Sequence, residues 1–455
     1  MQVKLLGIVG LVVLSSNGIA NQVWEKPVAP GLVYRMEIQQ DPPRIIHSLK
    51  MVTSNPVTSI MPELTGKTVY DAKGDGRATI TKLVNDTNAL AGINADFFPF
   101  TGHPLGLMVR EGQLLSLPNP KRASFAWGPN TSAFGFSKFT GTAITNDGTT
   151  IDIAGFNEEC PDNRVTLNTP EAGISKAKTP CVTVILKVDG TRLVPSTQIG
   201  ATVIASTNEG ANMPLKAGQF TLVAQGNKIN QLAGLKNGQR LTLKLNTTGF
   251  DWEKLENVVS GGPMLVRNGE IRVDGDNEGF SRSIIEDRHP RTALGRTVDG
   301  DLIFVAIDGR QKMSVGATLE EEAEIMRDLG CRDAMNLDGG GSTCMNVFGI
   351  DMNRPSDKTG ERPVANGIVF YGPKLLTPEQ KLKITVPANI TASGIGQARI
   401  VDKSGKEIPT IEIFWSMQGA GWIDQGGQIT GLEAGTATLQ AYVRGMTLTQ
   451  TVVIK

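Results

Sequence analysis

Short apolar runs and short stretches of alternating apolar and polar residues follow one another along most of the chain. Residues 302–307 are continuously apolar, which indicates a buried strand, and residues 438–443 and 449–454 alternate, which indicates half-buried strands. Glycine and proline, 52 and 24 residues, punctuate these stretches and favour turns between them. The chain of 455 residues has room for two or three domains. The pattern therefore predicts a sheet-rich protein with few helices, of the α+β class.

One helix is predicted over residues 319–329. Thr318 precedes it as a cap, and Glu321 stands three residues further on, which is the spacing of a capping box. Apolar residues recur at helical spacing along the segment, and Gly330 closes it. The glutamates at 320–322 complement the positive end of the helix dipole, so they have a structural explanation. We expect the apolar face of this helix to pack on a sheet.

Residues 378–455 differ in character from the rest of the chain. Their alternating stretches are separated by turn residues about every ten positions, as expected for a β-sandwich. The run from Ile429 to Val443 resembles the bacterial Ig-like group 2 domain. The resemblance implies an all-β Ig-like sandwich that acts as a spacer or contacts glycan or the cell envelope.

The first twenty residues have the pattern of a secretory signal peptide. A positive start at residues 1–4 is followed by an apolar run over 5–14 and by small residues up to Ala20. The apolar run has about ten residues, whereas a spanning helix needs about 20, and no later stretch reaches that length. The sequence therefore predicts cleavage near Ala20 and a secreted, periplasmic or cell-envelope protein without a transmembrane segment. A buried N-terminal strand is the alternative interpretation.

Charge and cysteine content narrow the choice of partners. Lys+Arg and Asp+Glu both total 45, so no basic field favours nucleic acid. Four cysteines suit an exported protein, and Cys160 and Cys181 flank a polar segment that a disulfide would stabilise. Cys331 and Cys344 lie in apolar surroundings and are compatible with a bridge or with free thiols. With three histidines and no Cys-x-x-Cys spacing, a zinc site is not predicted.

Candidate chemistry gathers at a glycine loop, Asp338-Gly339-Gly340-Gly341-Ser342. The carboxylate ends a predicted strand beside three residues without side chains. Backbone N–H groups of such a loop can converge on an anion, or a sugar can approach it closely. Three glycines are more than a hairpin turn needs. Asn336, two residues before Asp338, lies on the same face of the strand and can bind a hydroxyl or orient the carboxylate.

Other polar clusters stand at predicted strand ends. His289-Pro-Arg-Thr292 and Asp308-Gly-Arg310 combine imidazole, acidic and basic groups, and Asn94-Ala-Asp96 and Ser260-Gly-Gly262 add a polar pair and a second glycine loop. Acidic and basic groups at strand ends beside glycine are more typical of sites than of solvated faces. An arginine can grip a phosphodiester bidentately, whereas a lysine offers a point charge.

Taken in order, these clusters resemble the phosphodiester glycosidase family. The motifs that carry the resemblance are Asn94-Ala-Asp-Phe-Phe98, Ser260-Gly-Gly-Pro263, His289-Pro-Arg-Thr292, Asp308-Gly-Arg310, Gly316-Ala-Thr318, Asn336-Leu-Asp-Gly-Gly-Gly-Ser342 and Arg362-Pro-Val-Ala-Asn366. The resemblance implies that a domain over residues 86–373 hydrolyses a sugar-1-phosphodiester, of the N-acetylglucosamine-1-phosphodiester kind, to a sugar and a phosphomonoester. Ala95 and Asp96 stand where two glycines are common in the family, a departure that affects substrate contacts there.

A mechanism follows from the leaving group. A phosphomonoester leaves an anomeric carbon more readily than an alkoxide, so neutralising its charge should matter more than strong acid catalysis. We expect Arg291, Arg310 and the glycine-loop amides to hold the phosphate. Asp338 is then the general base or the stabiliser of the oxocarbenium-like centre, with Asp308 orienting an arginine and His289 transferring a proton. The predicted substrate-binding residues are Asn94, Asp96, Gly261, Gly262, Arg291, Arg310, Asn336, Gly339, Gly340, Ser342 and Asn366.

Two other functions fit the sequence. One is a non-catalytic binding protein of the envelope or exopolysaccharide machinery, which the Ig-like tail favours. The other is a metal-dependent phosphodiesterase in which Asp96, Asp308 and Asp338 hold Mg²⁺ or Ca²⁺. The favoured interpretation requires no cofactor and predicts no metal. The predicted organisation is a signal peptide at 1–20, a β-rich segment at 21–85, the glycosidase domain at 86–373 and the Ig-like domain at 378–455.

Overall fold

The computed structural model describes residues 11–14, 20–55, 57–71, 75–99, 101–208, 213–374 and 381–455. About 10% of the chain is helical and 48% is strand, which confirms the sheet-rich α+β class. Most of the predicted signal peptide, residues 1–10 and 15–19, lies outside the described residues, and Leu11–Leu14 forms strand β1, antiparallel to β2. Export therefore stays a prediction. Within the described ranges, no helix is long and apolar enough to cross a membrane.

The largest sheet joins the N-terminal segment to strands from much later in the chain. Its order is β1-β2-β3-β4-β25-β24-β26-β22-β23, with all neighbours antiparallel. The strands after β1 are β2 (Ala20–Ala29), β3 (Leu32–Gln40), β4 (Pro43–Met51), β25 (Leu302–Ile307), β24 (Arg291–Thr297), β26 (Cys331–Asn336), β22 (Met264–Arg267) and β23 (Glu270–Ile271). The apolar run at 302–307 is the predicted buried strand, and it pairs with β4 and β24 on its two sides.

Two five-stranded sheets complete the central part of the molecule. One has the order β28-β27-β6-β29-β5, and the other β10-β9-β21-β7-β8. The first consists of β28 (Ile350–Asp351), β27 (Met345–Val347), β6 (Ala91–Asn94), β29 (Asn366–Tyr371) and β5 (Ser59–Leu64); the second of β10 (Thr131–Phe136), β9 (Ala123–Gly128), β21 (Asn257–Ser260), β7 (Met108–Arg110) and β8 (Gln113–Ser116). One hydrophobic core runs through these sheets and the nine-stranded sheet, including Tyr34, Phe125, Phe304 and Phe370.

Helix α4 (Leu319–Asp328) confirms the predicted helix almost residue for residue. The Thr318 side chain accepts from the backbone N–H of Glu321, and the Glu321 side chain accepts in return from Thr318, so the capping box is present. Leu319, Ala323 and Met326 pack on the face of the nine-stranded sheet that carries Ala293 and Val305. The other helices are short: α1 (Ile80–Thr87), α2 (Ile229–Ala233), α3 (Arg282–Glu286) and the 3₁₀ turns at Pro170–Ala172, Gly226–Lys228, Gly340–Ser342 and Thr410–Glu412.

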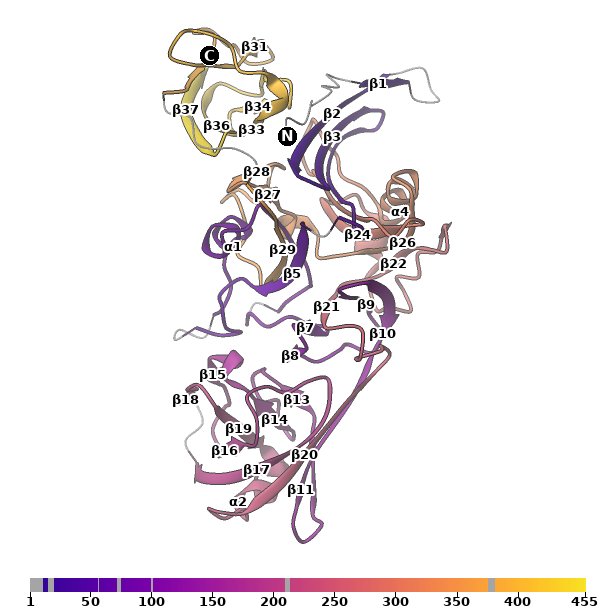
Figure 1. The fold of residues 1–455 in the computed structure, drawn as a ribbon, viewed down its shortest axis with the longest axis vertical. Helices are drawn as coiled ribbons and strands as arrows, with labels where there is room; N and C mark the ends of the chain where they lie inside the picture. Colours follow the sequence, from indigo (N-terminus) through magenta and orange to yellow (C-terminus); the bar gives the residue numbers. More distant parts are fainter. Residues whose placement is uncertain are drawn as a thin grey trace.

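A separate lobe is inserted between β10 and β21, at the lower end of the molecule in Figure 1. It has its own hydrophobic core around an eight-stranded sheet of order β12-β11-β20-β17-β16-β19-β14-β13. The strands are β12 (Thr150–Ile153), β11 (Lys138–Thr145), β20 (Arg240–Thr248), β17 (Ser196–Thr207), β16 (Cys181–Val188), β19 (Gln219–Gln225), β14 (Val165–Asn168) and β13 (Gly155–Phe156), with the small pair β15 (Ile174–Ser175) and β18 (Met213–Pro214) beside them.

Cys160 and Cys181 lie in one small apolar cluster in this lobe and are free thiols rather than the predicted disulfide. The Cys160 thiol donates to the Val223 carbonyl, at 3.3 Å, and buried apolar surroundings satisfy a thiol without oxidation. Cys331 and Cys344 are also buried free thiols.

The C-terminal residues form an all-β unit, shown in yellow in Figure 1. Its strands are β30 (Lys383–Thr385) with β32 (Arg399–Val401); β31 (Ile395–Gln397), β35 (Gln428–Gly431) and β34 (Gly421–Ile423); and β33 (Ile413–Gly419), β36 (Gly435–Val443) and β37 (Met446–Ile454). Leu439, Ala441, Val452 and Ile454 point into a core of its own, as the alternation predicts. Membership of the Ig-like family remains a prediction.

Candidate active site

The glycine loop follows β26 and is held against two of the other predicted motifs by backbone hydrogen bonds. Leu337 N–H donates to Thr292 O (2.7 Å), Gly340 N–H to Pro290 O (2.8 Å) and Asp338 N–H to Ala95 O (2.9 Å). A Cβ on Gly339 would lie 2.8 Å from Pro290 O, so the loop packs closely enough on the His-Pro-Arg-Thr segment to require glycine. Segments separated by more than 240 residues therefore meet at Asp338.

Asn94 joins these segments instead of facing a ligand. Its amide nitrogen donates to Asp338 O at 2.6 Å, and its oxygen accepts from the Thr292 hydroxyl at 2.9 Å and from Cys344 N–H at 3.0 Å. The side chain is 1% exposed. Because both ends of the amide are used by the scaffold, Asn94 positions the loop.

Asp96 and Asp338 form a pair of carboxyl groups close enough for their charges to interact. Burial raises the pKa of Asp96 to about 7, opposed by hydrogen bonds from Gly106 N–H (2.6 Å) and Phe97 N–H (2.8 Å) and by the charge of Arg122. Burial also raises the pKa of Asp338 to about 6, opposed by the Ser342 hydroxyl and the charge of Arg362. Two carboxyl groups with separated pKa values near neutrality can divide acid and base roles between them.

Arg122 supplies a cation to this pair. Its charge lowers the pKa of both Asp96 and Asp338. The guanidinium carbon lies 4.8 Å from the centre of the Phe97 ring and 4.7 Å from that of Phe280, so two aromatic faces hold it. Its Nε and Nη1 are buried and have no hydrogen-bond partner among the described residues. Buried donors are costly to leave unpaired, so an anion that reached them would be stabilised. No motif in the sequence marks Arg122 as a site residue.

Two further arginines lie over the glycine loop. A Cβ on Gly340 would stand 3.2 Å from Arg310 Nη2, and one on Gly341 would stand 2.1 Å from Arg362 Nη2. Arg362 is held by Asp357, through contacts of 2.8 Å and 3.0 Å, and reaches the Ser342 hydroxyl at 3.4 Å. The absence of side chains at 340 and 341 thus lets guanidinium groups approach the loop. Arg310 is among the predicted residues; Arg362 belongs to a quoted motif but was not selected.

His289 lies beside Arg310. Its Nδ1 is 3.2 Å from Arg310 Nη2, and its Nε2 is 3.0 Å from Ser283 O. Burial lowers the pKa of His289, and the charges of Arg291 and Arg310 lower it further. A neutral ring that donates to Ser283 O and accepts from Arg310 orients this arginine.

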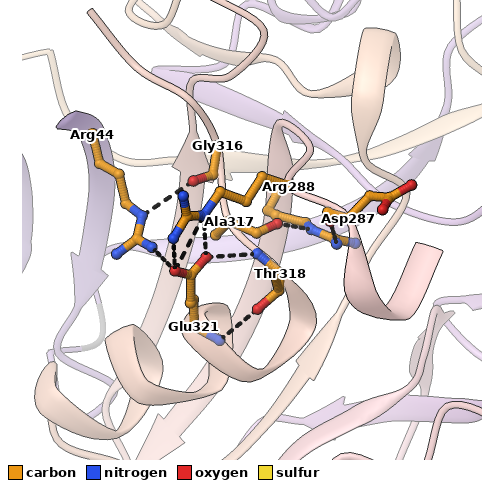
Figure 2. A network of polar contacts seen from close by, with 8 residues as sticks. Arg44, Asp287, Arg288, Gly316, Ala317, Thr318 and Glu321 are labelled. Carbon is orange, nitrogen blue, oxygen red and sulfur yellow. Dashed lines mark hydrogen bonds and ion pairs between the residues drawn. The ribbon is translucent and has the colours of Figure 1, made fainter. Parts of the chain in front are cut away.

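The structure gives Arg291 a position away from the glycine loop. The side chain is buried and donates to the carbonyls of Ala317 (2.7 Å), Ile284 (2.7 Å) and Asp287 (3.0 Å). Close by, Arg44 and Arg288 both pair with Glu321 at the start of α4, as Figure 2 shows. Although burial opposes ionisation, these arginines and the Thr318 N–H lower the pKa of Glu321 to about 2. Arg291 therefore belongs to the packing of α4, and its donors are used there.

Glu322 on the same helix provides a test of this packing. It is fully buried, neither carboxyl oxygen has a partner among the described residues, and burial raises its pKa to about 8, opposed by Arg291. The folded protein thus holds a proton that the unfolded chain releases near pH 4.5, so stability falls as the pH rises from about 4.5 to about 8.

We expect Glu322→Gln to raise Tm at pH 8 by roughly 2–4 °C or more and to leave it unchanged at pH 4.5, as measured by thermal unfolding. Glu324→Gln, on the exposed face of α4, is the matched control and should change Tm at neither pH. A Tm below that of the wild type at pH 8 would show that Glu322 is ionised and stabilising.

Asp308 is buried, and its carboxylate is held by a neighbouring segment. Its Oδ1 accepts from Arg354 N–H at 2.8 Å. Its Oδ2 lies 3.7 Å from His47 Nε2, and neither Oδ2 nor Nε2 has a hydrogen-bond partner among the described residues. The structure shows Asp308, two residues before Arg310 in the chain, anchoring the segment of Arg354. It does not bring Asp308 to the Asp96–Asp338 pair.

The remaining predicted residues support the pair. Asn366 Oδ1 accepts from Asp96 N–H at 2.9 Å, and Asn336 Nδ2 donates to Gly262 O at 2.7 Å. A Cβ on Gly261 would lie 2.5 Å from Asn336 O, and one on Gly262 would lie 2.6 Å from Glu278 Oε2. Gly261 therefore allows the second glycine loop to press against the end of β26, and Gly262 allows the loop to approach Glu278. Buried Glu278 accepts from Ala123 N–H and Met264 N–H and was not selected from the sequence.

The aspartates considered as metal ligands are not gathered at one point. Within the described ranges, the cysteine and carboxylate ligand atoms that lie within 4.8 Å of one another belong to Cys344, Asp351 and Glu361. The Cys344 thiol lies 3.3 Å from Glu361 Oε1 and 3.6 Å from Asp351 Oδ1, and burial raises the pKa of Glu361 to about 7. Hydrogen bonds between the Cys344 thiol and the two carboxyl groups therefore satisfy the polar atoms of this cluster.

Comparison with known proteins gives a family match to part of the chain. Residues 187–371 match the model of the phosphodiester glycosidase family. The match covers the glycine loop, His289 to Thr292 and Arg362, and begins after Asp96 and Arg122. It supports the family that the motifs indicate and fits a hydrolase of sugar phosphodiesters.

Relatives are distant. N-acetylglucosamine-1-phosphodiester alpha-N-acetylglucosaminidase of Mus musculus is 28% identical over 183 residues, which are 35% of this chain and 35% of the mouse protein. The match thus spans about a third of this curated relative. Crystal structures of a hypothetical protein from Synechocystis (TM-score 0.63, 22% identity, covering 77% of this chain and 64% of that one) and of a putative exported protein from Burkholderia pseudomallei (TM-score 0.61, 21% identity, covering 72% and 74%) share the fold.

Proposed function

We propose that this protein is an exported hydrolase that cleaves the glycosidic bond of a sugar-1-phosphodiester, of the N-acetylglucosamine-1-phosphodiester kind. The observation that carries the proposal is the pair Asp96 and Asp338, with pKa values of about 7 and about 6, beside Arg122, whose Nε and Nη1 have no hydrogen-bond partner among the described residues. The family match and the activity named for the mouse relative support the same reaction.

The two carboxyl groups supply different chemistry at the anomeric carbon. Asp338 has the lower pKa of the two, so it ionises first as the pH rises and Asp96 keeps its proton longer. The ionised Asp338 stabilises the positive charge that develops as the glycosidic bond breaks, or activates the attacking water. The protonated Asp96 donates a hydrogen bond or proton on the leaving side.

The arginines neutralise the departing phosphomonoester. Arg310 and Arg362 lie over the glycine loop, and Nε and Nη1 of Arg122 have no partner in the part of the chain that the structure describes. Fixed guanidinium groups stabilise the developing phosphate charge without reorganising in the transition state. In this account Arg310, Arg362 and Arg122 replace the predicted pair of Arg291 and Arg310, because Arg291 donates to backbone carbonyls near α4.

A panel of sugar-1-phosphodiesters tests the proposal. We expect release of free sugar and phosphomonoester, with N-acetylglucosamine-1-phosphodiesters turned over at the highest kcat/KM. Binding of these compounds without turnover would contradict the proposal and favour a non-catalytic binding protein. Turnover abolished by a chelator and restored by Mg²⁺ or Ca²⁺ would favour the metal-dependent phosphodiesterase.

A further inference from the structure

The hairpin that follows the glycine loop contains a turn that its own sequence does not favour. Phe348 and Gly349 connect β27 to β28, and both have positive φ, 56° and 84°. A two-residue turn of this kind prefers Asn or Gly at its first position. A phenylalanine there is strained, and such strain persists where surrounding contacts hold it. Contacts of the Phe348 side chain must therefore matter more than the preference of the turn.

Those contacts come from the C-terminal β-unit. The Phe348 ring stacks on Tyr442 of β36, with centroids 4.0 Å apart and an angle of 15°, and meets the edge of Phe414 of β33 at 5.2 Å. Phe414 and Trp422 belong to the same buried core as Tyr34 and Val347 of the central sheets. The unit thus extends the core of the glycosidase domain, as a loosely tethered spacer would not.

The same unit also holds the segment between the hairpin and Arg362, residues 352–362, which we call the strap. Arg354 donates to Gly419 O at 2.7 Å and to Gly421 O at 2.9 Å, both in the C-terminal unit. Its own N–H donates to Asp308 Oδ1 at 2.8 Å. Arg354 therefore connects the C-terminal unit to Asp308, two residues before Arg310 in the chain.

The strap leads directly to the groups around the glycine loop. Asn353, which is 2% exposed, donates to Thr343 O at 3.1 Å and accepts from Met345 N–H at 2.7 Å, so the start of the strap is fixed to the end of the loop. Further along, Ser356 lies 3.5 Å from Arg310 Nη1, and Asp357 binds Arg362. Moving the strap would move both arginines.

We propose that the C-terminal β-unit is a positioning part of the active site. By holding Phe348 and Arg354, it fixes the hairpin and the strap, and so sets the places of Arg310 and Arg362 over the glycine loop. The consequence for catalysis rests on the proposed function. The sequence resemblance alone implied a spacer or an adhesion unit for these residues.

Two variants of the full chain test this inference. Phe348→Asn suits the turn, so the hairpin should still form while the aromatic contact is lost. Arg354→Ala removes the donors to Gly419 and Gly421 but keeps the backbone N–H that Asp308 accepts. Arg399→Ala, which breaks an exposed ion pair with Glu407 elsewhere in the same unit, is the matched control.

We expect faster hydrogen exchange of the strap, about a tenfold fall in kcat/KM for the phosphodiester and about a tenfold rise in the inhibition constant of inorganic phosphate. The Arg399→Ala protein should match the wild type in all of these. Unchanged exchange in both variants would show that the unit does not hold the strap. Faster exchange with unchanged phosphate inhibition would show that the strap does not place the arginines.

These outcomes are separate from the fate of the proposed function. If the wild-type protein turns over no phosphodiester, the proposed function fails. The exchange comparison then decides by itself whether the C-terminal unit positions the strap.

Discussion

Asp338→Asn should lower kcat for a sugar-1-phosphodiester by about 10³-fold while leaving KM within about threefold of the wild type. The amide has nearly the same shape and can keep its contact with Ser342, but it carries no negative charge and cannot accept a proton. Loss of kcat with little change in KM is the signature of an interaction made chiefly in the transition state.

Asp333→Asn is the matched control for this substitution. Asp333 lies on the same strand, β26, and pairs with Arg296 at 3.0 Å, outside the candidate site. The Asp333→Asn protein should retain the wild-type kcat at a temperature well below its Tm. Near-normal turnover by Asp338→Asn would remove Asp338 from the mechanism.

Arg122→Met should lower kcat/KM by about 10²-fold and also move the pH profile. The wild-type profile should rise through about pH 6, as Asp338 ionises, and fall through about pH 7, as Asp96 loses its proton. Because the Arg122 charge lowers the pKa of both carboxyl groups, its removal raises both, and both limbs should shift to higher pH.

Two further variants sharpen this prediction. Arg122→Lys should restore much of the pH profile but less of the rate, since an ammonium lacks the planar face that Phe97 and Phe280 hold. Arg110→Met, which removes an arginine of β7 that pairs with Glu63, should change neither limb. A profile of Arg122→Met that coincides with the wild type would show that the guanidinium does not act on the pair.

Local signals in the sequence were sufficient for individual elements. The capping box and apolar spacing fixed the bounds of α4 to within one residue, because both depend on neighbours within one or two turns. The apolar run at 302–307 became β25 with the same bounds. The ordered motifs also brought together the glycine loop, His289 and Arg310, although only the fold shows the contacts.

The direction of side chains was harder to predict from the sequence than the bounds of helices and strands. Along β24, Arg291 and Ala293 share one face and Thr292 faces the other, since side chains alternate. Ala293 packs against α4, so Arg291 is directed there too, whereas the Thr292 hydroxyl reaches Asn94 in the site. Knowing which face the predicted helix covers would have corrected the interpretation of Arg291.

Arg122 gave no comparable signal. It lies in the connection between β8 and β9, and the aromatic rings that hold it come from positions 97 and 280. The pairing of β2–β4 with β24–β26 is equally non-local, because residues 20–51 carry no mark of a partner more than 250 residues away. Contacts of this range follow from the assembled core and not from any local pattern.

The bond that is broken decides whether the carboxyl pair acts at an anomeric carbon while arginines accept a phosphate. Hydrolysis of a sugar-1-phosphodiester in heavy-oxygen water, followed by mass spectrometry of both products, identifies the broken bond. Attack at the anomeric carbon should place the heavy oxygen in the sugar and leave the phosphomonoester unlabelled. Heavy oxygen in the phosphomonoester would show attack at phosphorus and contradict cleavage at the anomeric carbon.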